Sequence, residues 1–461
     1  MDEGQLFQGV DWRQLLPFTH IFRAFRIAIH PSKLMLGLAL LLTVYAGGRL
    51  LDALWPAKSR AVVDEVSIYE ASNTSADFQA GVSAVTGDER FGLFHTLFEY
   101  QTHEFDGVVH GVLSNDWFET PLSPGVPGHI YNFVVVGPLW LVQIHPVFAI
   151  FFAILFLSSW SLFGGAIARL AAVHVARDEK VSVRQALDFA IGKFLSFASA
   201  PIIPMLIVLG VGLLLAGASL LVNIPILGPV VLGAAFCLAL LAGFVQTLVI
   251  LGAIGGFNLM YPTVAVEGSD SFDAISRSFS YVYARPWRML FYTGVAVAYG
   301  AVTYLFVRFF ILLMLALAHH FVAMGSFVHV GLLPSMWPSP LTTGRLTYTP
   351  DYPSLTWAES IGAGMLSFWI YLVIGVLGAF AISFYFSANT IIYLLMRRQL
   401  DATAMDDVYL ENSDDDFSPP TPATEQAVVS ETVIIETSQA SQPPAGAAAG
   451  ASSGPQAPAG S

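Results

Sequence analysis

Long apolar runs alternate with short polar stretches along this chain of 461 residues. A membrane-spanning helix needs about 20 mostly apolar residues. Six runs reach that length, at roughly 34–55, 146–172, 197–222, 230–260, 288–318 and 361–396. The pattern therefore predicts an all-α integral membrane protein with about six transmembrane helices. No small-residue cleavage site follows the first run, so we interpret it as a retained helix rather than a signal peptide.

The stretch VEGSDSFDAISRSFSYVYARPWRM, residues 266–289, breaks the apolar pattern between two runs. Asp270 can accept hydrogen bonds from the first turn of a helix. Apolar residues then recur at helical spacing among polar ones, at Ile275, Phe279 and Val282. This spacing predicts an amphipathic helix that lies flat in the cytoplasmic interface. Pro286 ends it where the next run begins.

A second segment, SVRQALDFAIGKF at residues 182–194, has the same pattern. Ser182 and Gln185 are spaced as a capping box. Each segment follows a run with a glycine pair and precedes a run with a proline, namely Gly164-Gly165 with Pro201 and Gly255-Gly256 with Pro286. The arrangement favours a weak parallel repeat of spanning helix, interfacial helix and spanning helix.

The sequence YPTVAVEGSDSFDAISRSF resembles a signature of bacterial polytopic membrane proteins related to the glycerophosphoryl diester phosphodiesterase membrane domain, together with neighbouring families of unknown function. The residues that match are Pro262, Val264, Val266, Glu267, Gly268, Ala274 and Ser278. The resemblance covers roughly residues 146–320. No segment is long and polar enough to form the soluble phosphodiesterase barrel that some members carry. The resemblance therefore implies a scaffold or membrane-domain role and gives no chemistry.

Composition and charge place these elements relative to the membrane. The chain is 55% hydrophobic and 11% charged. With the N-terminus inside, fourteen of the twenty Lys and Arg residues fall on the cytoplasmic side, while the loop 56–138 carries eleven acids against three bases. Because basic residues near helix ends stay in the cytoplasm, we expect a multi-pass protein of the bacterial cytoplasmic (inner) membrane with both termini cytoplasmic.

Five regions follow from this reading. They are a cytoplasmic interfacial segment at 1–33, the first transmembrane helix at 34–55, an extracytoplasmic loop domain at 56–145, a five-helix membrane domain at 146–400, and an acidic cytoplasmic tail at 401–461. The tail holds ten acids and no base, so the other 400 residues account for only −3 of the net charge of −13. It is rich in Ser, Pro, Ala, Gln and Gly, and we expect it to be disordered. We expect the last helix to stop near Leu400, because Arg397 and Arg398 would anchor at anionic headgroups.

Histidines in the loop give one candidate for chemistry. In FHTLFEYQTHEF, His95, Glu99 and His103 recur every four residues and share one helical stripe. Such a stripe could bind a metal ion. The three side chains spread over roughly 12 Å, too far to meet at one ion without other ligands. We therefore favour an amphipathic helix on the membrane surface, and we assign no metal-ligating residue.

Polar residues in or near the apolar runs give further candidates. A charge inside the bilayer suggests function, but Arg308 falls near the outer surface, where its side chain can snorkel. The run continues past it, so we expect 310–327 to be an interfacial or re-entrant segment. We expect a local ion pair between Arg49 and Asp52. The remaining polar residues are expected to hydrogen-bond between helices rather than line a path: Gln246, Asn258, Ser383 and Asn389. The adjacent His319 and His320 face different ways on a helix and indicate a metal site only weakly.

No metalloprotease, hydrolase, P-loop or dinucleotide-binding motif occurs in the chain. We assign no catalytic or cofactor-binding residue and expect no cofactor and no nucleic acid. The single cysteine, Cys237, allows no internal disulfide.

We predict a non-enzymatic membrane scaffold or accessory protein, with membrane lipids and a cytoplasmic protein bound by the acidic tail as partners. The alternative is a transporter or lipid-handling permease, which a cavity lined by Gln246, Asn258 and Asn389 would favour. An enzyme built on the loop histidines is the third hypothesis.

Overall fold

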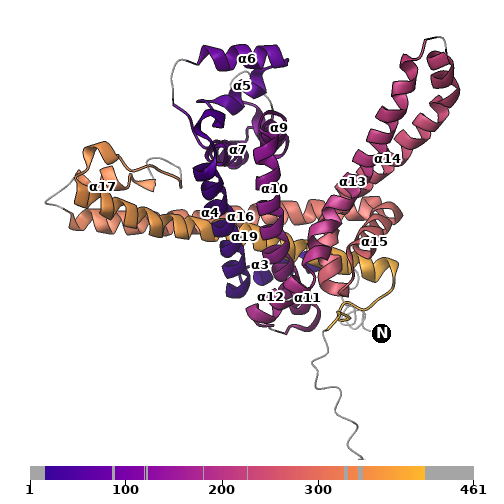
Figure 1. Ribbon diagram of the computed structural model, residues 1–461. Coiled ribbons are helices and arrows are strands. Elements are labelled where there is room, and N and C mark those ends of the chain that lie inside the picture. The colour runs from indigo at the N-terminus through magenta and orange to yellow at the C-terminus, as the bar shows by residue number, and fades with distance from the viewer. Residues whose placement is uncertain are drawn as a thin grey trace, which may run out of the picture. The chain divides into compact units, whose positions relative to one another are not determined.

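The computed structural model describes residues 16–85, 89–118, 120, 123–179, 181–225, 227–326, 331–340 and 346–410. Across these ranges the chain is helical, with two isolated β-bridges and no strand (Figure 1). The all-α class is confirmed.

The long helices correspond to the apolar runs. They are α4 (Pro31–Leu54), α13 (Phe194–Ser219), α14 (Leu227–Glu267), α16 (Pro286–Gly325) and α19 (Trp357–Leu400), together with α10 (Pro146–Ser159), which continues through a π-helical turn at Trp160–Gly164 into α11 (Gly165–Arg177). The shorter helices are α3 (Arg23–Ala28), α5 (Glu65–Ala71), α6 (Ser75–Ala84), α7 (Leu93–Ser114), α8 (Gly125–Tyr131), α9 (Gly137–Ile144), α12 (Val183–Gly192), α15 (Ser271–Ala284) and α17 (Leu332–Met336).

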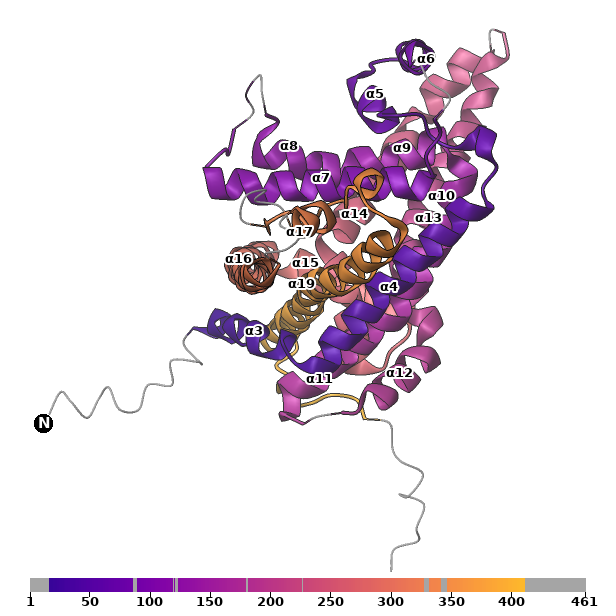
Figure 2. The ribbon, with the colours of Figure 1, turned by 90° about the vertical axis from the view of Figure 1, so that its left-hand side faces the viewer.

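Seven helical segments of the described chain are long and apolar enough to cross a membrane, one more than the sequence pattern indicated. The additional segment is Gly125–Ile144, which comprises α8, a π-helical turn and α9. It lies within the region 56–145, which we call the loop domain. In Figure 2, α7 lies beside α8 and α9, at an angle to α4. The protein is therefore a multi-pass membrane protein, and the position of α8–α9 decides the number of crossings.

Side-chain contacts favour six crossings. Trp55, at the end of α4, packs edge-on against Phe148 at the start of α10, with ring centroids 5.0 Å apart. At the other end of α4, Lys33 lies 3.3 Å from His174 near the end of α11. These two contacts make α4 and α10–α11 an antiparallel pair, so the chain leaves and re-enters the bundle at the same end. The segment α8–α9 therefore belongs to the loop domain. We call the opposite end, where α4 begins and α11, α14 and α19 end, the strap side, after residues 401–409, which fold over the ends of α14 and α19 there.

The two amphipathic segments are helices with the expected caps. Ser182 and Gln185 form both hydrogen bonds of a capping box before α12. Asp270 accepts from the backbone N–H of Asp273, 2.9 Å away, at the start of α15. Proline occupies the first position of α16, where a backbone N–H would have no partner within the helix, so the N–H that proline lacks is not missed. Both helices follow a spanning helix and precede another, which agrees with the order predicted for the repeat.

The largest core lies on the strap side, where α11, α14, α15 and α19 pack together. Small residues allow this close approach. A Cβ atom on Gly164 would lie 2.4 Å from the ring of Phe386, and one on Gly165 would lie 2.8 Å from the ring of Phe197. Ala274 and Ser278 of α15 are fully buried against α14. A second core fills the loop domain, and a third joins α16, α17 and α19.

The fifth and sixth apolar runs form longer helices than expected. Helix α16 continues without a break to Gly325. The expected interfacial or re-entrant segment at 310–327 is therefore wrong, because its residues up to 325 extend the same helix. Residue 327 lies outside the described residues. The 40 residues of α16 correspond to about 60 Å, twice the thickness of a hydrocarbon core. In its far half, Ile311 and Leu315 pack with Leu333 of α17 and with α19. Helix α19 ends at Leu400, as predicted.

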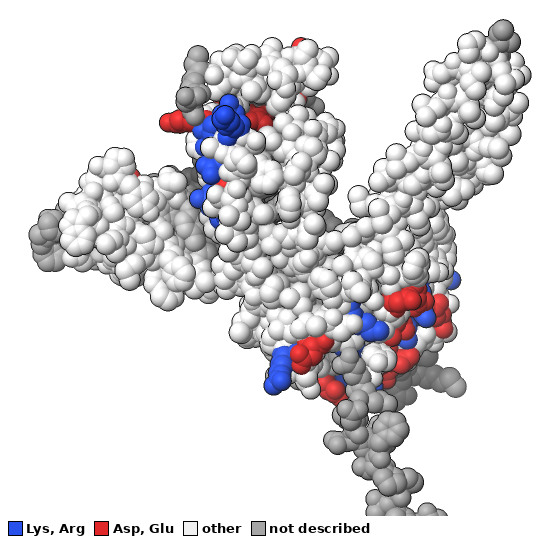
Figure 3. All heavy atoms as spheres, in the orientation of Figure 1, with Lys and Arg blue, Asp and Glu red and all other residues white. Residues whose placement is uncertain are grey.

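Charged side chains gather in two zones, one over the loop domain and one over α11, α12 and α15 (Figure 3). Between them the residues on this face are uncharged. The hairpin of α13 and α14 carries no Asp, Glu, Lys or Arg from Phe194 to Val266. This distribution is the one expected when a bilayer covers the middle of the bundle.

Cysteine labelling tests the number of crossings. Ser75 in α6 and Glu179 after α11 are both exposed. Each is changed to cysteine in a chain that lacks Cys237, and a membrane-impermeant reagent is added from one side. With six crossings, the two sites react from opposite sides of the membrane. If α8–α9 were a seventh crossing, both would react from the same side. Ser114→Cys is the control, because it shares the side of Ser75 in either arrangement.

Candidate functional site

A buried ion pair joins the ends of α14 and α19. Glu267 is the last residue of α14, and Arg397 lies in the last turn of α19, with 8% of its side chain exposed. The Arg397 Nε atom lies 2.8 Å from Glu267 Oε1, outside hydrogen-bond geometry, so the attraction between them is electrostatic. The Tyr393 hydroxyl donates to the same carboxylate oxygen, 2.9 Å away. One carboxylate is thus shared by two groups from successive turns of α19.

The first residues after α19 fold back over this pair. We call residues 401–409 the strap. Arg397 Nη1 donates to the backbone carbonyl of Asp407 at 2.6 Å, and Nη2 donates to its carboxylate at 3.0 Å. The backbone N–H of Tyr409 donates to the carbonyl of Val266 at 2.8 Å. The predicted tail boundary at 401 is therefore too early, because residues 401–409 belong to the folded body. The rest of the predicted tail, from 411, lies outside the described residues.

Gly268 is required where the strap crosses α14. Its φ of +63° is in the left-handed region, which glycine adopts readily and other residues rarely do. A Cβ atom there would also lie 2.5 Å from the ring of Tyr409. The Glu-Gly pair of the motif therefore ends α14, presents the carboxylate to Arg397 and leaves room for Tyr409. The motif is a structural joint between α14, α15 and the strap.

Polar residues of α15 surround the ion pair. Arg277 Nε donates to both carboxylate oxygens of Asp273 at 3.0 Å, and its Nη1 lies 4.0 Å from Glu267. Burial alone would lower the pKa of Arg277, but the Asp273 carboxylate outweighs it and the pKa lies above its ordinary value. Tyr281 donates a hydrogen bond to Asp401 of the strap. Burial and then this carboxylate raise the pKa of Tyr281. Arg277 therefore stays charged and Tyr281 stays protonated at neutral pH.

The loop domain has its own buried polar network. Glu65 is 4% exposed and accepts hydrogen bonds from His145, from Trp140 and from the backbone N–H of Val62. Burial alone would raise the pKa of Glu65, but these partners hold it below its ordinary value. In the same domain His129 pairs with the buried Glu104 at 2.8 Å. These carboxylate–histidine pairs fasten α5 to the junction of α9 and α10, and α7 to α8.

The predicted histidine stripe does not converge on one point. His95 lies 3.4 Å from Glu99, while His103 is exposed on the next turn of α7. Within the described residues no group of three His, Cys, Asp or Glu side chains is arranged to hold a metal ion. In the separate pair His319-His320, the ring of His319 contacts the backbone carbonyl of Trp337 at 3.1 Å. Glu99 and His103 are exposed on α7, and His95 is half-buried.

Asp52 does not form the expected pair with Arg49. Among the ion pairs of the described residues, none joins these two side chains. The Asp52 carboxylate instead accepts from the backbone N–H groups of Phe94 and His95, at 2.8 and 2.9 Å. It therefore caps the N-terminus of α7, where the helix dipole favours an anion. A Cβ atom on Gly92 would lie 2.1 Å from this carboxylate.

Three of the four intramembrane polar residues bond between helices, as expected. Gln246 of α14 donates to the carbonyl of Val208 in α13 at 2.9 Å. Tyr385 of α19 donates to Asn258 of α14 at 2.7 Å. Ser383 donates to the carbonyl of Ala28 at 2.8 Å, and Asn389 is buried. Arg308 pairs with Asp106 of α7 at 3.1 Å, so it has a protein partner in addition to any contact with headgroups.

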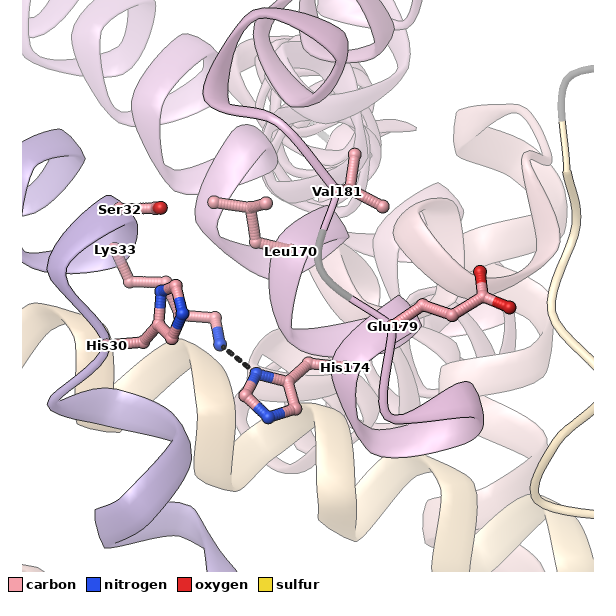
Figure 4. Close-up of a pocket in the computed structure, with 7 residues that line it drawn as sticks. All are labelled: His30, Ser32, Lys33, Leu170, His174, Glu179 and Val181. Carbon is pink, nitrogen blue, oxygen red and sulfur yellow. Dashed lines mark hydrogen bonds between the residues drawn. The ribbon is translucent and has the colours of Figure 1, made fainter.

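A small polar cavity lies at the start of α4 on the strap side (Figure 4). Lys33 is 1% exposed and points toward His174, with its Nζ also donating to the carbonyl of Ile27 at 3.1 Å. The volume is about 10 Å³, which is close to the space of one water molecule. Lys33 therefore ties α4 to α3 and α11, and the cavity is too small for a substrate.

A scan against protein-family models finds no match to this chain, and searches of curated proteins and of solved structures find none either. The Glu267–Arg397 joint therefore rests on its own geometry. Sequence reasoning assigned Arg397 to headgroups and overlooked its burial. One available signal was Tyr393, four residues earlier on the same helical face.

Neighbouring arginines provide a matched test of the joint. Arg397 is buried and Arg398 is exposed on the same turn of α19. Removing one partner of a buried ion pair costs about 3 to 5 kcal/mol. Arg397→Gln should lower the free energy of unfolding in detergent by that amount, while Arg398→Gln should change it by less than about 0.5 kcal/mol. Adding Glu267→Gln to Arg397→Gln should cost less than the sum of the two single changes. Equal stability of the two arginine variants would contradict this assignment.

Hydrogen exchange tests the cap on α7. Asp52→Ala removes the acceptor for two backbone N–H groups, and loss of such a cap costs about 0.5 to 2 kcal/mol. The amides of Phe94 and His95 should exchange faster in this variant, while the strap side keeps its protection. Asp188→Ala on α12 is the control, because that side chain is 65% exposed. Unchanged exchange at the first turn of α7 would show that Asp52 is not its cap.

Proposed function

We propose that this protein is a non-enzymatic membrane scaffold that holds an acidic segment at the membrane surface. The observation that carries the proposal is the strap. Residues 401–409 are fastened to α19 by the contact of Arg397 with Asp407, to α14 by Tyr409, and to α15 by the hydrogen bond from Tyr281 to Asp401. The 51 residues from 411 contain seven acids and no Lys or Arg. A strap fixed on the body would give such a segment a defined point of attachment.

The intramembrane polar residues support the same reading. Gln246 and Asn258 are engaged in hydrogen bonds between helices. Neither of the two cavities described here, the one beside Lys33 and an apolar one between α7, α16 and α19, is lined by Gln246, Asn258 or Asn389. A polar path would need such side chains to face open space. This arrangement supports a scaffold over a transporter of polar solutes.

A lipid-handling role is the second candidate, favoured by the apolar cavity between α7, α16 and α19.

We further propose that the protein lies in a bacterial cytoplasmic (inner) membrane with both termini in the cytoplasm, and that it is related to the membrane-domain family that its motif resembles. The basic residues of α11, α12 and α15, which share one charged zone, support this orientation. In this orientation the acidic segment would meet basic cytoplasmic proteins.

Two truncations separate recruitment from folding. A chain that ends at Leu410 keeps the strap, and a chain that ends at Leu400 loses it. We expect the first to keep the melting temperature of the full chain in detergent but to recover fewer protein partners in a pull-down. The second should also melt at a lower temperature, because Arg397 loses Asp407. The control is a full-length chain in which the seven acids after 410 are changed to Asn or Gln.

The charge-neutral chain distinguishes electrostatic recruitment from other binding. It should lose the same partners as the chain that ends at Leu410. Partners of the wild-type chain should dissociate as salt rises from about 0.05 to 0.5 M, because the Debye length falls severalfold over that range. If the chain that ends at Leu410 recovers the same partners as the full chain, the recruitment proposal is wrong.

A further inference from the structure

An apolar cavity of about 300 Å³ opens between α7, α16 and α19. Its lining includes Phe105 and Val109 from α7, Val297 and Tyr304 from α16, and Phe380 and Phe384 from α19. A dry apolar cavity of about 150 Å³ is enough to hold benzene. The space between these helices can therefore hold several carbons of a hydrocarbon chain.

Two contacts join α7 to α16 at one end of this cavity. The ring of Phe105 meets the ring of Tyr304 edge to face, with centroids 5.6 Å apart. One turn further along α16, Arg308 Nη1 donates to Asp106 at 3.1 Å. From Val297 to Arg308 the helix rises by about 16 Å. The cavity therefore runs along α16 from Leu305 to Val297, and Arg308 lies one turn beyond its lining.

The surroundings match a phospholipid. The lining residues of α16 and α19 belong to segments apolar enough to span a membrane, so acyl chains are the solvent there. An empty apolar space forfeits dispersion contacts with its lining, which favours its being filled. Arg308 carries five N–H donors. Asp106 takes one through Nη1, and Tyr304 also interacts with the guanidinium, which leaves donors for phosphate oxygens.

We propose that this cavity binds one anionic phospholipid, with an acyl chain along Val297–Leu305 and the headgroup phosphate at Arg308. The polar rim agrees with this. His103 and His110 are exposed on α7, one turn to either side of Asp106, on the same helical face. They add hydrogen-bond donors beside the headgroup position. The site does not depend on the acidic tail, so it can be tested apart from the scaffold function.

Photolabelling tests the acyl-chain position with a matched pair of variants. Val297 and Val302 lie on α16, and each is 66% exposed, but only Val297 lines the cavity. The protein is placed in nanodiscs that contain phosphatidylglycerol with a diazirine on the acyl chain, and labelled peptides are quantified after irradiation. In the wild-type chain the label should concentrate on residues 105–112 and 297–305. In Val297→Trp it should fall by about tenfold, a change of about 1.4 kcal/mol.

Val302→Trp should keep the wild-type labelling, because its side chain points away from the cavity. Equal labelling in the two tryptophan variants would overturn the proposal. Labelling spread evenly over exposed apolar helices such as α13 would show ordinary annular lipid and would also overturn it. Absence of label from these peptides in the wild-type chain would indicate that a second copy of the chain covers this face, and it would also overturn the proposal.

A second comparison tests the headgroup. Labelling by phosphatidylglycerol is measured against labelling by phosphatidylcholine that carries the same diazirine chain. The wild-type chain should prefer the anionic lipid severalfold, and Arg308→Gln should lose this preference. Asp106→Asn breaks the same ion pair but keeps the cation, so it should retain the preference. The double variant Asp106→Asn/Arg308→Gln buries no unpaired charge and serves if the single arginine variant fails to fold. An unchanged preference without Arg308 would refute the headgroup assignment.

Discussion

The Glu267 carboxylate and the Arg397 guanidinium meet 2.8 Å apart where two helices of about 60 Å end. Removing these charges from water is costly, and their attraction compensates only when other groups complete the hydrogen bonding. Here Tyr393 donates to the carboxylate and Asp407 accepts from two N–H groups of the guanidinium, while Arg397 Nε has no hydrogen-bond partner. The strap depends on this pair, because Asp407 binds the same guanidinium. The close packing of Gly268 against Tyr409 follows from the strap. One charged contact thus joins the ends of α14 and α19 to the strap.

The sequence predicted the features that neighbouring residues determine. The caps at Ser182 and Asp270, the break before Pro286 and the end of α19 at Leu400 each depend on a few adjacent positions, and all are present. The features it missed join distant positions. Asp52 caps a helix that begins 41 residues later, and Arg397 pairs with a residue 130 positions earlier. The periodicity of apolar residues along the chain cannot reveal which distant side chains pair. It also could not show that the apolar α8–α9 segment packs against α5 and α7.

The α13–α14 hairpin follows a different principle from the rest of the bundle. The apolar windows that mark these two helices as spans contain no buried residue. In water such exposure would oppose folding, but lipid is as apolar as leucine and imposes no such cost. The hydrogen bond from Gln246 to Val208 then links the two helices where water cannot compete. The strap-side core, in contrast, is stabilised by packing of small and aromatic residues. Lipid and protein thus serve as solvents for different parts of one chain.

Helix α4 connects the two polar regions of the molecule. At its start Lys33 binds the carbonyl of Ile27 and contacts His174, and at its end Asp52 caps α7. The distance between these two anchors is set by an unbroken helix of 24 residues. The height of α7 above the strap side is therefore fixed by α4. Because α7 meets α16 through Asp106 and Arg308, the same helix determines where the apolar cavity opens along α16. A change at Lys33 or Asp52 would therefore act on the cavity without touching its lining.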